Sequence, residues 1–324
     1  MRQNYTLEQI KTIMNNYDLG EPINFSIFEV GIENTNILVE TSTNKYVIKI
    51  CESETAKVKD IELEISLMQK AFDSGLPVPK IIKTIANTNL VIFLSKPTFV
   101  MSYLEGVNVY AEQVSISFLE EVASASAKMV KCFFDLKNNN FEKREHYWNL
   151  QTFSEGKKYL VYLDKDKKVD KKLIGTIYEE WERKVAVNFS VMQTSFIHGD
   201  IAAHNLLMHD GHLSGIIDFG DASYGCIIFE LAIAIAQLCM LQNDWQEAVK
   251  VYAKKFQEIL PLNKIEKDIL YYLVRCRSAN MIVICNGLYH TEAKRKDYVW
   301  FHDQGVENLK KLEKIGKEKF DKIL

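Results

Sequence analysis

The chain has 324 residues, of which 47% are hydrophobic and 26% charged, an ordinary profile for a globular protein. This length predicts two lobes, because a single core rarely grows beyond roughly 250–300 residues. The formal net charge of −3 excludes a global basic field, so we expect no nucleic-acid partner and no acidic membrane surface as a partner.

The six cysteines show no CxxC spacing, which disfavours zinc sites and disulfide frameworks. The chain starts with a polar amphipathic helix pattern rather than with a signal peptide. We therefore expect buried, reduced thiols in a cytoplasmic protein. The most apolar window, Ile227–Leu241, contains Glu230 and Gln237 and is too short for a membrane span, so it is interpreted as a core helix.

The N-terminal part of the chain predicts a small sheet with one helix between its strands. Thr6 and Gln9 form a capping-box pattern that predicts a first helix over Thr6–Asn16. Apolar residues at helical spacing predict a second helix over Lys59–Phe72. We assign residues 1–103 to this N-terminal lobe. Runs of β formers between turn formers predict antiparallel strands over Ile23–Val30, Thr35–Thr41, Lys45–Cys51, Lys80–Ala86, Leu90–Ser95 and Pro97–Tyr103.

Residues 104–324 predict a mostly helical lobe, with the boundary near Met101–Gly106. Its one strong strand signal lies in the stretch 196–221. The charge run Lys165–Lys172 is interpreted as a solvated loop rather than a polyanion site. Helical spacing of apolar residues predicts helices over Ser115–Leu136, Thr152–Leu163, Leu173–Phe189, Ile227–Leu241, Gln246–Ile259, Lys264–Tyr289 and Tyr298–Ile323.

The stretch Phe196–Asp221 reads FIHGDIAAHNLLMHDGHLSGIIDFGD and contains Asp200, Asn205 and Asp218. Asp-Gly at 210–211 is a strong hairpin signal, so we expect the three polar residues to gather at one end of a hairpin. Oxygen ligands of this kind suit a hard cation such as Mg²⁺. An acid shortly before an Asn metal ligand is also typical of phosphoryl-transfer enzymes, where the acid orients a hydroxyl. The alternative is a surface hairpin with ordinary turn acids.

Other polar residues near this stretch are given structural roles. His198 is expected to order the loop by hydrogen bonding rather than to act as a general base. His204, His209 and His212 have no accompanying cysteine, so zinc ligation is disfavoured. Glu230, inside an apolar helix, must be satisfied by backbone N–H groups or by an arginine.

Lys49 lies in the run YVIKI, where strand alternation places it on a face with apolar neighbours. A lysine on such a face is uncommon unless it is paired, and the next helix offers Glu62 and Glu64. In kinases a strand lysine contacts nucleotide phosphates and is held by a helix glutamate. We favour Glu64 as the partner, because it lies one turn before Met68. The alternative role of Lys49 is that of a solvated edge-strand residue.

Two further segments are candidates for nucleotide contact. The loop from Gly31 to Asn36 lacks GxGxxG, so it would cover phosphates with backbone N–H groups and asparagines, or be a plain hairpin turn. Met101–Leu104 ends an apolar strand, where exposed backbone groups suit an adenine edge or a simple linker. The predicted nucleotide-contact residues are Lys49, Glu64, Gly31, Asn34, Asn36, Ser102, Tyr103 and Leu104.

HGDIAAHN followed by IIDFGD resembles the HGDxxxxN…IDxxD signature of the aminoglycoside phosphotransferase/choline kinase-like superfamily. YVIKI, GLPVP and VMSYLEG extend the resemblance over nearly the whole chain. It implies an α+β, bilobal protein-kinase-like fold: an N-lobe with an antiparallel sheet and one helix, and a mostly helical C-lobe with the catalytic hairpin. LYHTEAKRKDYVWFHDQGVENLKKL is similar to the hydroxylysine kinase branch, and YDLGEPINF with GIENTN is similar to the homoserine kinase branch.

The resemblance implies a kinase that transfers the γ-phosphate of ATP or GTP to a hydroxyl of a small amino acid or amino alcohol. It implies Asp200 as the catalytic base, Asn205 and Asp218 as Mg²⁺ ligands and Lys49 as a phosphate contact. The alternative within this class is an aminoglycoside, choline or sugar phosphotransferase. The alternative from another class is a non-catalytic, nucleotide-binding pseudokinase.

The acceptor pocket is expected between the Asp200 loop and the helical lobe. Arg275 or Arg277, on one helix, could bind a substrate carboxylate, although both could equally pair with Glu230 or face solvent. Asp221 could bind a substrate ammonium group or support the metal loop. The candidate acceptor-binding residues are Asp221, Tyr224, Arg275 and Arg277.

Overall fold

The computed structural model describes residues 5–28, 34–52, 57–109, 113–136, 147–291 and 299–324. The chain divides into two compact units. Unit 1 comprises Met1–Gly106 and Ser214–Gly220, and unit 2 comprises Val107–Leu213 and Asp221–Leu324. Unit 1 thus takes a short second segment from the stretch that the sequence pattern assigned entirely to the C-terminal lobe.

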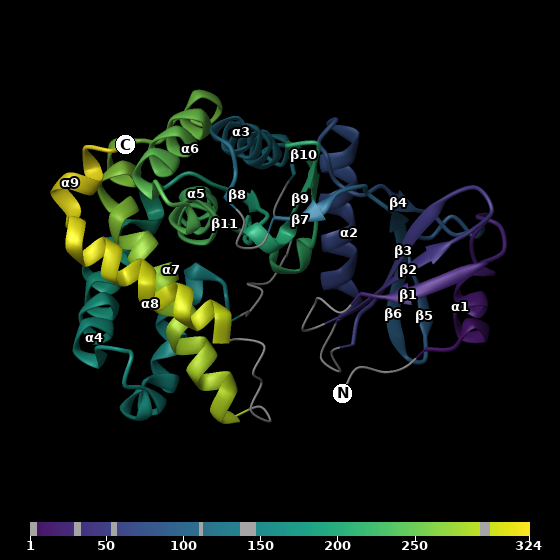
Figure 1. Cartoon of the computed structure of the whole chain (residues 1–324), viewed down its shortest axis with the longest axis horizontal. Helices are drawn as coiled ribbons and strands as arrows, with labels where there is room; N and C mark the ends of the chain where they lie inside the picture. Colours follow the sequence, from purple (N-terminus) through teal and green to yellow (C-terminus); the bar gives the residue numbers. More distant parts are fainter. Residues whose placement is uncertain (1–4, 29–33, 53–56, 110–112, 137–146, 292–298) are drawn as a thin grey trace. The chain divides into compact units, whose positions relative to one another are not determined.

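Unit 1 contains an antiparallel sheet and the helices α1 (Leu7–Met14) and α2 (Val58–Asp73), coloured purple to blue in Figure 1. The strand order is β1-β2-β3-β6-β4, and β5 also pairs with β6. The predicted capping box is present at the start of α1, where Thr6 and Gln9 exchange hydrogen bonds. The strands are β1 (Asn24–Ile27), β2 (Thr35–Glu40), β3 (Lys45–Ile50), β4 (Ile81–Ile82), β5 (Val91–Phe93) and β6 (Lys96–Ser102).

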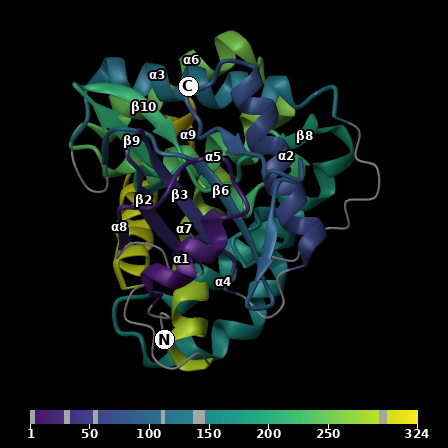
Figure 2. The same cartoon turned by 90° about the vertical axis from the view of Figure 1, so that its right-hand side faces the viewer.

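The two faces of this sheet are covered by different helices. Ile48 of β3 shares a core with Ile10 and Ile13 of α1. Because side chains alternate along a strand, Lys49 points to the opposite face, where it meets Glu64 of α2. Figure 1 shows α1 and α2 on opposite sides of the sheet, and Figure 2 shows α1 lying over the strands.

The strand predicted over Leu90–Ser95 ends earlier than expected. Phe93, the last residue of β5, pairs with Lys96, so Leu94 and Ser95 form a two-residue turn. Both turn residues have a positive φ, 48° and 63°, as a type I′ hairpin turn requires. Leucine and serine are not typical of that turn, and the sequence therefore gave no signal for the end of the strand.

Unit 2 is mostly helical, and its long helix α7 packs against α5, α8 and the 3₁₀ segment η1. Figure 1 shows α7 and α8 side by side. None of the helices in the described ranges is long and apolar enough to cross a membrane. The segments are α3 (Ile116–Cys132), η1 (Leu150–Lys165), α4 (Lys171–Glu180), α5 (Ile228–Gln237), α6 (Trp245–Ile259), α7 (Lys264–Thr291), α8 (Val299–Ile315) and α9 (Lys317–Asp321).

The helix predicted over Leu173–Phe189 gives only α4, and residues 181–191 continue as a π-helical turn and 3₁₀ turns. The wider turn changes the helical phase. Trp181 then contacts both Phe189 and Phe229, with ring centroids 5.6 and 6.2 Å away. Aromatic packing therefore accompanies the break in the regular period.

Short strands carry the stretch that holds the candidate site residues. β8 pairs antiparallel with β11, and β9 pairs with β7. β9 and β10 form the predicted hairpin, and at its turn Asp210 and Gly211 have φ values of 50° and 81°. The strands are β7 (Val107–Asn108), β8 (Thr194–Ile197), β9 (Leu206–His209), β10 (His212–Ile216) and β11 (Ser223–Cys226).

Candidate active site

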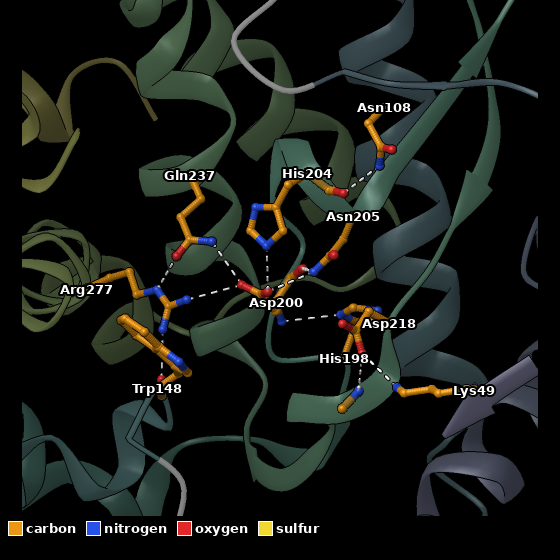
Figure 3. Close-up of polar contacts among 11 residues, drawn as sticks. Lys49, Asn108, Trp148, His198, Asp200, His204, Asn205, Asp218, Gln237 and Arg277 are labelled. Atoms are coloured by element: carbon orange, nitrogen blue, oxygen red, sulfur yellow. Dashed lines mark hydrogen bonds and ion pairs between the residues drawn. The ribbon is translucent and has the colours of Figure 1, made fainter. Parts of the chain in front are cut away.

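In unit 1, Lys49 is held by two carboxylates. Its Nζ atom lies 2.5 Å from Glu64 Oε1 and 3.0 Å from Asp218 Oδ1, the second contact being drawn in Figure 3. The side chains of Lys49 and Glu64 are 3% and 1% exposed, whereas Glu62 lies on the exposed side of α2. The partner of Lys49 is therefore Glu64, the residue favoured from the sequence. Lys49 is not on an edge strand, because β3 pairs with both β2 and β6.

The surroundings of Lys49 keep it charged. Burial alone would lower the pKa of the ammonium group, but the carboxylates of Asp218 and Glu64 outweigh burial and hold that pKa above its ordinary value. Asp218 has a φ of 63°, in the left-handed region, and its Oδ1 also accepts the N–H of Gly220 across 3.1 Å. The Asp218 side chain is 48% exposed, so part of this carboxylate faces solvent.

Among the predicted nucleotide contacts, Asn36 shares a sheet face with Lys49, because the two residues are paired across β2 and β3. Asn36 Oδ1 is buried and has no hydrogen-bond partner within the described ranges. A ligand could supply that partner. Asn34 directly precedes β2, and Gly31 lies outside the described residues.

The backbone after β6 is partly used within unit 1. The Ser102 N–H donates to Lys80 O across 2.8 Å, and the Ser102 hydroxyl accepts the Lys80 N–H. The Tyr103 N–H donates to Lys45 O across 3.4 Å. The N–H groups of Ser102 and Tyr103 are therefore engaged, so an adenine edge at this segment would have to take its N–H donor from Leu104.

In unit 2, the loop after β8 carries Asp200. Gly199 has a φ of 78°, and a Cβ atom there would lie 2.7 Å from Asp221 O, so conformation and space both require glycine. Glu230, buried in α5, accepts the N–H groups of His198 and Gly199 across 3.3 and 2.9 Å. His198 Nδ1 accepts the N–H of Asp200 across 3.3 Å. Glu230 and His198 thus hold the loop backbone, as expected from the sequence.

The Asp200 carboxylate is bonded through both of its oxygens (Figure 3). Oδ1 accepts from Gln237 Nε2 across 2.9 Å and from Arg277 Nη2 across 3.2 Å. Oδ2 accepts from Asn205 Nδ2 across 2.7 Å and lies 3.2 Å from His204 Nε2. Four side chains therefore fix the plane of this carboxylate.

Electrostatics keep Asp200 ionised. Burial alone would raise the pKa of its carboxyl group, but His204, Arg277 and His198 hold that pKa well below its usual range. A carboxylate with this environment orients a hydroxyl donor strongly and accepts its proton weakly.

The predicted metal ligands lie in different units, Asn205 in unit 2 and Asp218 in unit 1, and each carries an oxygen atom of the kind that a hard divalent cation binds. Asn205 is buried and its Nδ2 also donates to Asp200 O across 3.1 Å, which leaves the amide oxygen on the side away from Asp200. In the described ranges no group of three or more His, Cys, Asp or Glu side chains could hold a metal. Mg²⁺ is commonly bound by one or two protein ligands together with water and phosphate oxygens, so it does not need a group of three such side chains.

The two arginines predicted as substrate contacts are already engaged. Arg275 forms ion pairs with Glu180 and, across 2.8 Å, with Glu313. Arg277 belongs to the carboxylate network, and the two side chains are only 4% and 2% exposed. Two positions along a helix are about 200° apart, so they point to opposite sides of α7. Neither expected alternative, pairing with Glu230 or facing solvent, is observed.

A small pocket in unit 2 lies beside the Asp200 loop, and the predicted residue Asp221 lines it. Tyr224 is not part of its lining: its hydroxyl lies 3.0 Å from the Thr194 hydroxyl, and its ring packs edge-on against Phe196. The lining residues are Trp148, Asn149, Leu150, Ile197, Gly199, Asp221, Ser223, Phe229 and Ile233.

Sequence reasoning missed the roles of Gln237 and His204 beside Asp200. A glutamine in an otherwise apolar helix has to find a polar partner, and this was the available signal for Gln237. His204 lies in the short 3₁₀ turn Ala203–Asn205, which places its ring on the same carboxylate as Asn205. The available signal for His204 was its position directly before Asn205, the predicted metal ligand.

Residues 24–256 match the sequence pattern of APH, the phosphotransferase enzyme family. This match spans more than half of the chain. The chain belongs to the phosphotransferase enzyme family.

This phosphotransferase is similar to two groups of curated relatives. Hydroxylysine kinase of Xenopus laevis is 27% identical over 303 residues, which cover 86% of this chain and 80% of the relative. Homoserine kinase of Methylobacillus glycogenes is 24% identical over 265 residues, which cover 81% of this chain and 79% of the relative.

Among solved structures, the phosphotransferase is similar to an amicoumacin kinase in complex with AMP-PNP, Ca²⁺ and Ami. The TM-score is 0.71 at 12% identity, over 95% of this chain and 94% of that chain. The likeness confirms the predicted α+β, protein-kinase-like fold class. Together with the family match, the curated relatives confirm a small-molecule kinase that phosphorylates a hydroxyl group.

Proposed function

We propose that this phosphotransferase transfers the γ-phosphoryl group of ATP or GTP, bound with Mg²⁺, to the hydroxyl of a small amino acid or amino alcohol. The observation that carries the proposal is the Asp200 carboxylate, ionised and fixed by four side chains beside a small pocket. The family match supports phosphoryl transfer, and the relatives named as hydroxylysine and homoserine kinases support an amino acid acceptor.

On the nucleotide side, Lys49 would neutralise phosphate charge while Glu64 keeps its ammonium group in place. Asn205 and Asp218 would hold the divalent cation through their oxygen atoms. When bound, that cation screens the charge of the transferring phosphoryl group. The backbone of Leu104 would meet the adenine or guanine edge, with Asn34, Asn36 and the Gly31 loop as proposed phosphate or ribose contacts.

On the acceptor side, Asp200 would orient the substrate hydroxyl and receive its proton. Its low pKa suits a loose phosphoryl-transfer transition state, in which little nucleophile activation is needed and the proton moves late. Positioning and charge stabilisation then supply most of the acceleration.

The pocket beside Asp200 supports the proposed acceptor class. Asp221, which lines this pocket, would supply one carboxylate for a substrate ammonium group, and Phe229 and Ile233 make the neighbouring wall apolar. Because Arg275 and Arg277 are engaged within the fold, a substrate carboxylate would have to be met by other groups. Backbone N–H groups are such donors.

The test is a phosphotransfer screen with Mg-ATP and Mg-GTP against hydroxylysine, homoserine, choline, methylthioribose and aminoglycosides. We expect turnover with one of the first two compounds. Turnover only with choline, a sugar or an aminoglycoside would contradict the acceptor class. Mg-nucleotide binding without transfer to any hydroxyl would contradict the enzymatic proposal and support a nucleotide-binding protein.

A further inference from the structure

Asp200, Gln237 and Arg277 form a closed triangle of hydrogen bonds. Gln237 Nε2 donates to Asp200 Oδ1 across 2.9 Å, Arg277 Nε donates to Gln237 Oε1 across 2.6 Å, and Arg277 Nη2 donates to Asp200 Oδ1 across 3.2 Å. Figure 3 shows all three contacts. Each member of the triangle is bonded to the other two.

Arg277 sets the direction of this triangle. A guanidinium group has only donors, so it forces the amide oxygen of Gln237 to face it and the amide N–H₂ to face Asp200. Arg277 and Gln237 are 2% exposed, so water does not compete for these groups. The orientation of both donors to Asp200 Oδ1 is therefore fixed by Arg277.

The same guanidinium also holds a pocket wall. Arg277 Nη1 donates to Trp148 O across 2.8 Å, and its Cζ atom lies 5.5 Å from the centroid of the Trp148 ring. One helical turn later, Asn280 Nδ2 donates to Tyr147 O across 3.1 Å. Two residues of α7, Arg277 and Asn280, thus anchor the backbone at 147–148. Of these two residues, Arg277 also contacts the Asp200 carboxylate.

We propose that Arg277 is a positioning residue that holds the Asp200 carboxylate in register with the pocket wall at Trp148. The proposal rests on the proposed function, in which Asp200 orients the acceptor hydroxyl. This positioning role replaces the expectation from the sequence that Arg277 binds a substrate carboxylate. A residue that acts through Asp200 should affect turnover, whereas a substrate-binding residue should affect the KM of the acceptor.

The principal variants are Arg277→Met and Gln237→Glu. Arg277→Met removes one of the two donors to Asp200 Oδ1 and the donor to Trp148 O. It also frees the Gln237 amide to rotate. Gln237→Glu keeps an acceptor for Arg277 Nε but places a carboxylate oxygen where the amide N–H₂ faced Asp200. The two negative charges then repel each other, which displaces the Asp200 carboxylate. With Mg-ATP and the amino acid that gives the highest rate in the screen, we expect kcat to fall about tenfold to a hundredfold, the range of a small misplacement. The KM values of both substrates should stay within about twofold.

Two matched controls come from the same helix. Arg275→Met removes an equally buried arginine that pairs with Glu180 and Glu313 but does not contact Asp200. Asn280→Ala loosens the backbone at Tyr147 without touching the carboxylate. We expect kcat of Arg275→Met to stay within about twofold of the wild type, and kcat of Asn280→Ala to fall by less than that of Arg277→Met. An equal fall in kcat in the controls would show a general packing effect and overturn the inference.

A double-variant cycle tests whether Arg277 acts through Asp200. In the background Asp200→Asn, the further change Arg277→Met should lower kcat by less than about threefold, because its target is already lost. The pair also removes both buried charges together, so it remains informative where Arg277→Met alone does not fold. Independent losses that multiply in the pair would overturn the inference.

Two other results separate this inference from the proposed function. A raised acceptor KM with unchanged kcat in Arg277→Met would mean that Arg277 binds substrate, and the positioning role would fall while the kinase assignment stands. Near-normal turnover in Asp200→Asn would instead remove the proposed role of Asp200, and with it the inference about Arg277.

Discussion

Lys49 on β3 and Glu64 on α2 form an ion pair of 2.5 Å that is almost completely removed from solvent. Lys49 also reaches Asp218, whose carboxylate is half exposed, so one ammonium group links a fully buried acid to a solvent-facing one. The buried acid positions the lysine, and the exposed acid faces solvent.

Removing Lys49 should damage both stability and binding. Lys49→Met leaves Glu64 buried without its cation, a change that typically costs about 3–5 kcal/mol in the free energy of unfolding. Urea unfolding measures this loss. The double variant Lys49→Met/Glu64→Leu should recover most of the stability, but not the thermal stabilisation by Mg-ATP. Recovery of that stabilisation in the double variant would contradict a role for Lys49 at the phosphates.

Replacing Asp200 should separate chemistry from nucleotide binding. Asp200→Ala should reduce turnover at least about a hundredfold, the lower range for loss of a general base. The thermal shift with Mg-ATP should stay close to that of the wild type. A steady-state assay with the acceptor identified in the screen gives kcat, and a fall of less than about threefold would speak against Asp200 as the base.

Asp218 should be needed for the metal-bound nucleotide. Asp218→Asn keeps a residue type that tolerates a positive φ but removes the charge, so we expect the Mg-ATP thermal shift to disappear with little loss of intrinsic stability. Asp218→Ala should also lose that shift and be less stable by about 1–2 kcal/mol, because its backbone is strained at this φ. An undiminished Mg-ATP shift in Asp218→Asn would show that the metal is held elsewhere.

Glu230 should make stability depend on pH. Burial raises the pKa of its carboxyl group from 4.5 to about 7, although the N–H groups of Gly199 and His198 oppose the rise. The folded state therefore keeps the proton more tightly than the unfolded chain. This contribution is fully present below pH 4.5 and is lost as the pH rises through about 7, a fall of about 3 kcal/mol in the free energy of unfolding.

Glu230→Gln should remove this fall. The variant loses a hydrogen-bond acceptor at every pH, so its free energy of unfolding is shifted by a roughly constant amount. The quantity to compare is therefore the slope of the free energy of unfolding against pH. Urea unfolding between pH 4.5 and 8 should give a smaller fall with pH in the variant than in the wild type. Parallel curves would show that the Glu230 carboxyl group titrates alike in the folded and unfolded states.

Gly199 should tolerate substitution less well than other turn glycines. Gly199→Ala combines an unfavourable φ with a Cβ only 2.7 Å from Asp221 O, so we expect a loss of about 2–4 kcal/mol in stability and a large loss of turnover. Gly211→Ala is the matched control, because its φ of 81° is similar but nothing lies within 4 Å of the added atom. Its loss should be confined to about 1–2 kcal/mol, with turnover unchanged. Equal losses of stability in the two variants would exclude the close contact as the cause.

Local patterns predicted much of unit 1. Strand alternation correctly placed Lys49 on the face opposite Ile48, and helical spacing with Met68 correctly selected Glu64. These inferences succeeded because each depends on a period of two or 3.6 residues within one element. The early end of β5 was missed, because Leu94 and Ser95 adopt a positive φ without the usual residue types.

The surroundings of Asp200 were harder to predict. Arg275 and Arg277 lie two positions apart in one predicted helix, and the sequence does not distinguish them. Both are buried in the structure, yet Arg277 contacts the Asp200 carboxylate whereas Arg275 pairs with Glu180. Which of the two does so depends on the rotation of α7 about its axis. That rotation is set by packing against α5, α8 and η1, and no local pattern encodes it.

The contact between Lys49 and Asp218 joins residues separated by 169 positions in the chain. Ribosomes add about 5–20 residues per second, so roughly 10–30 s of synthesis separate the two partners. During that interval the sheet of unit 1 can form while Lys49 has only Glu64 as a partner. Unit 1 is therefore completed only after most of the polypeptide has been synthesised, and a fragment ended at Gly106 would contain all the strands of the sheet but lack the acid proposed to bind the metal.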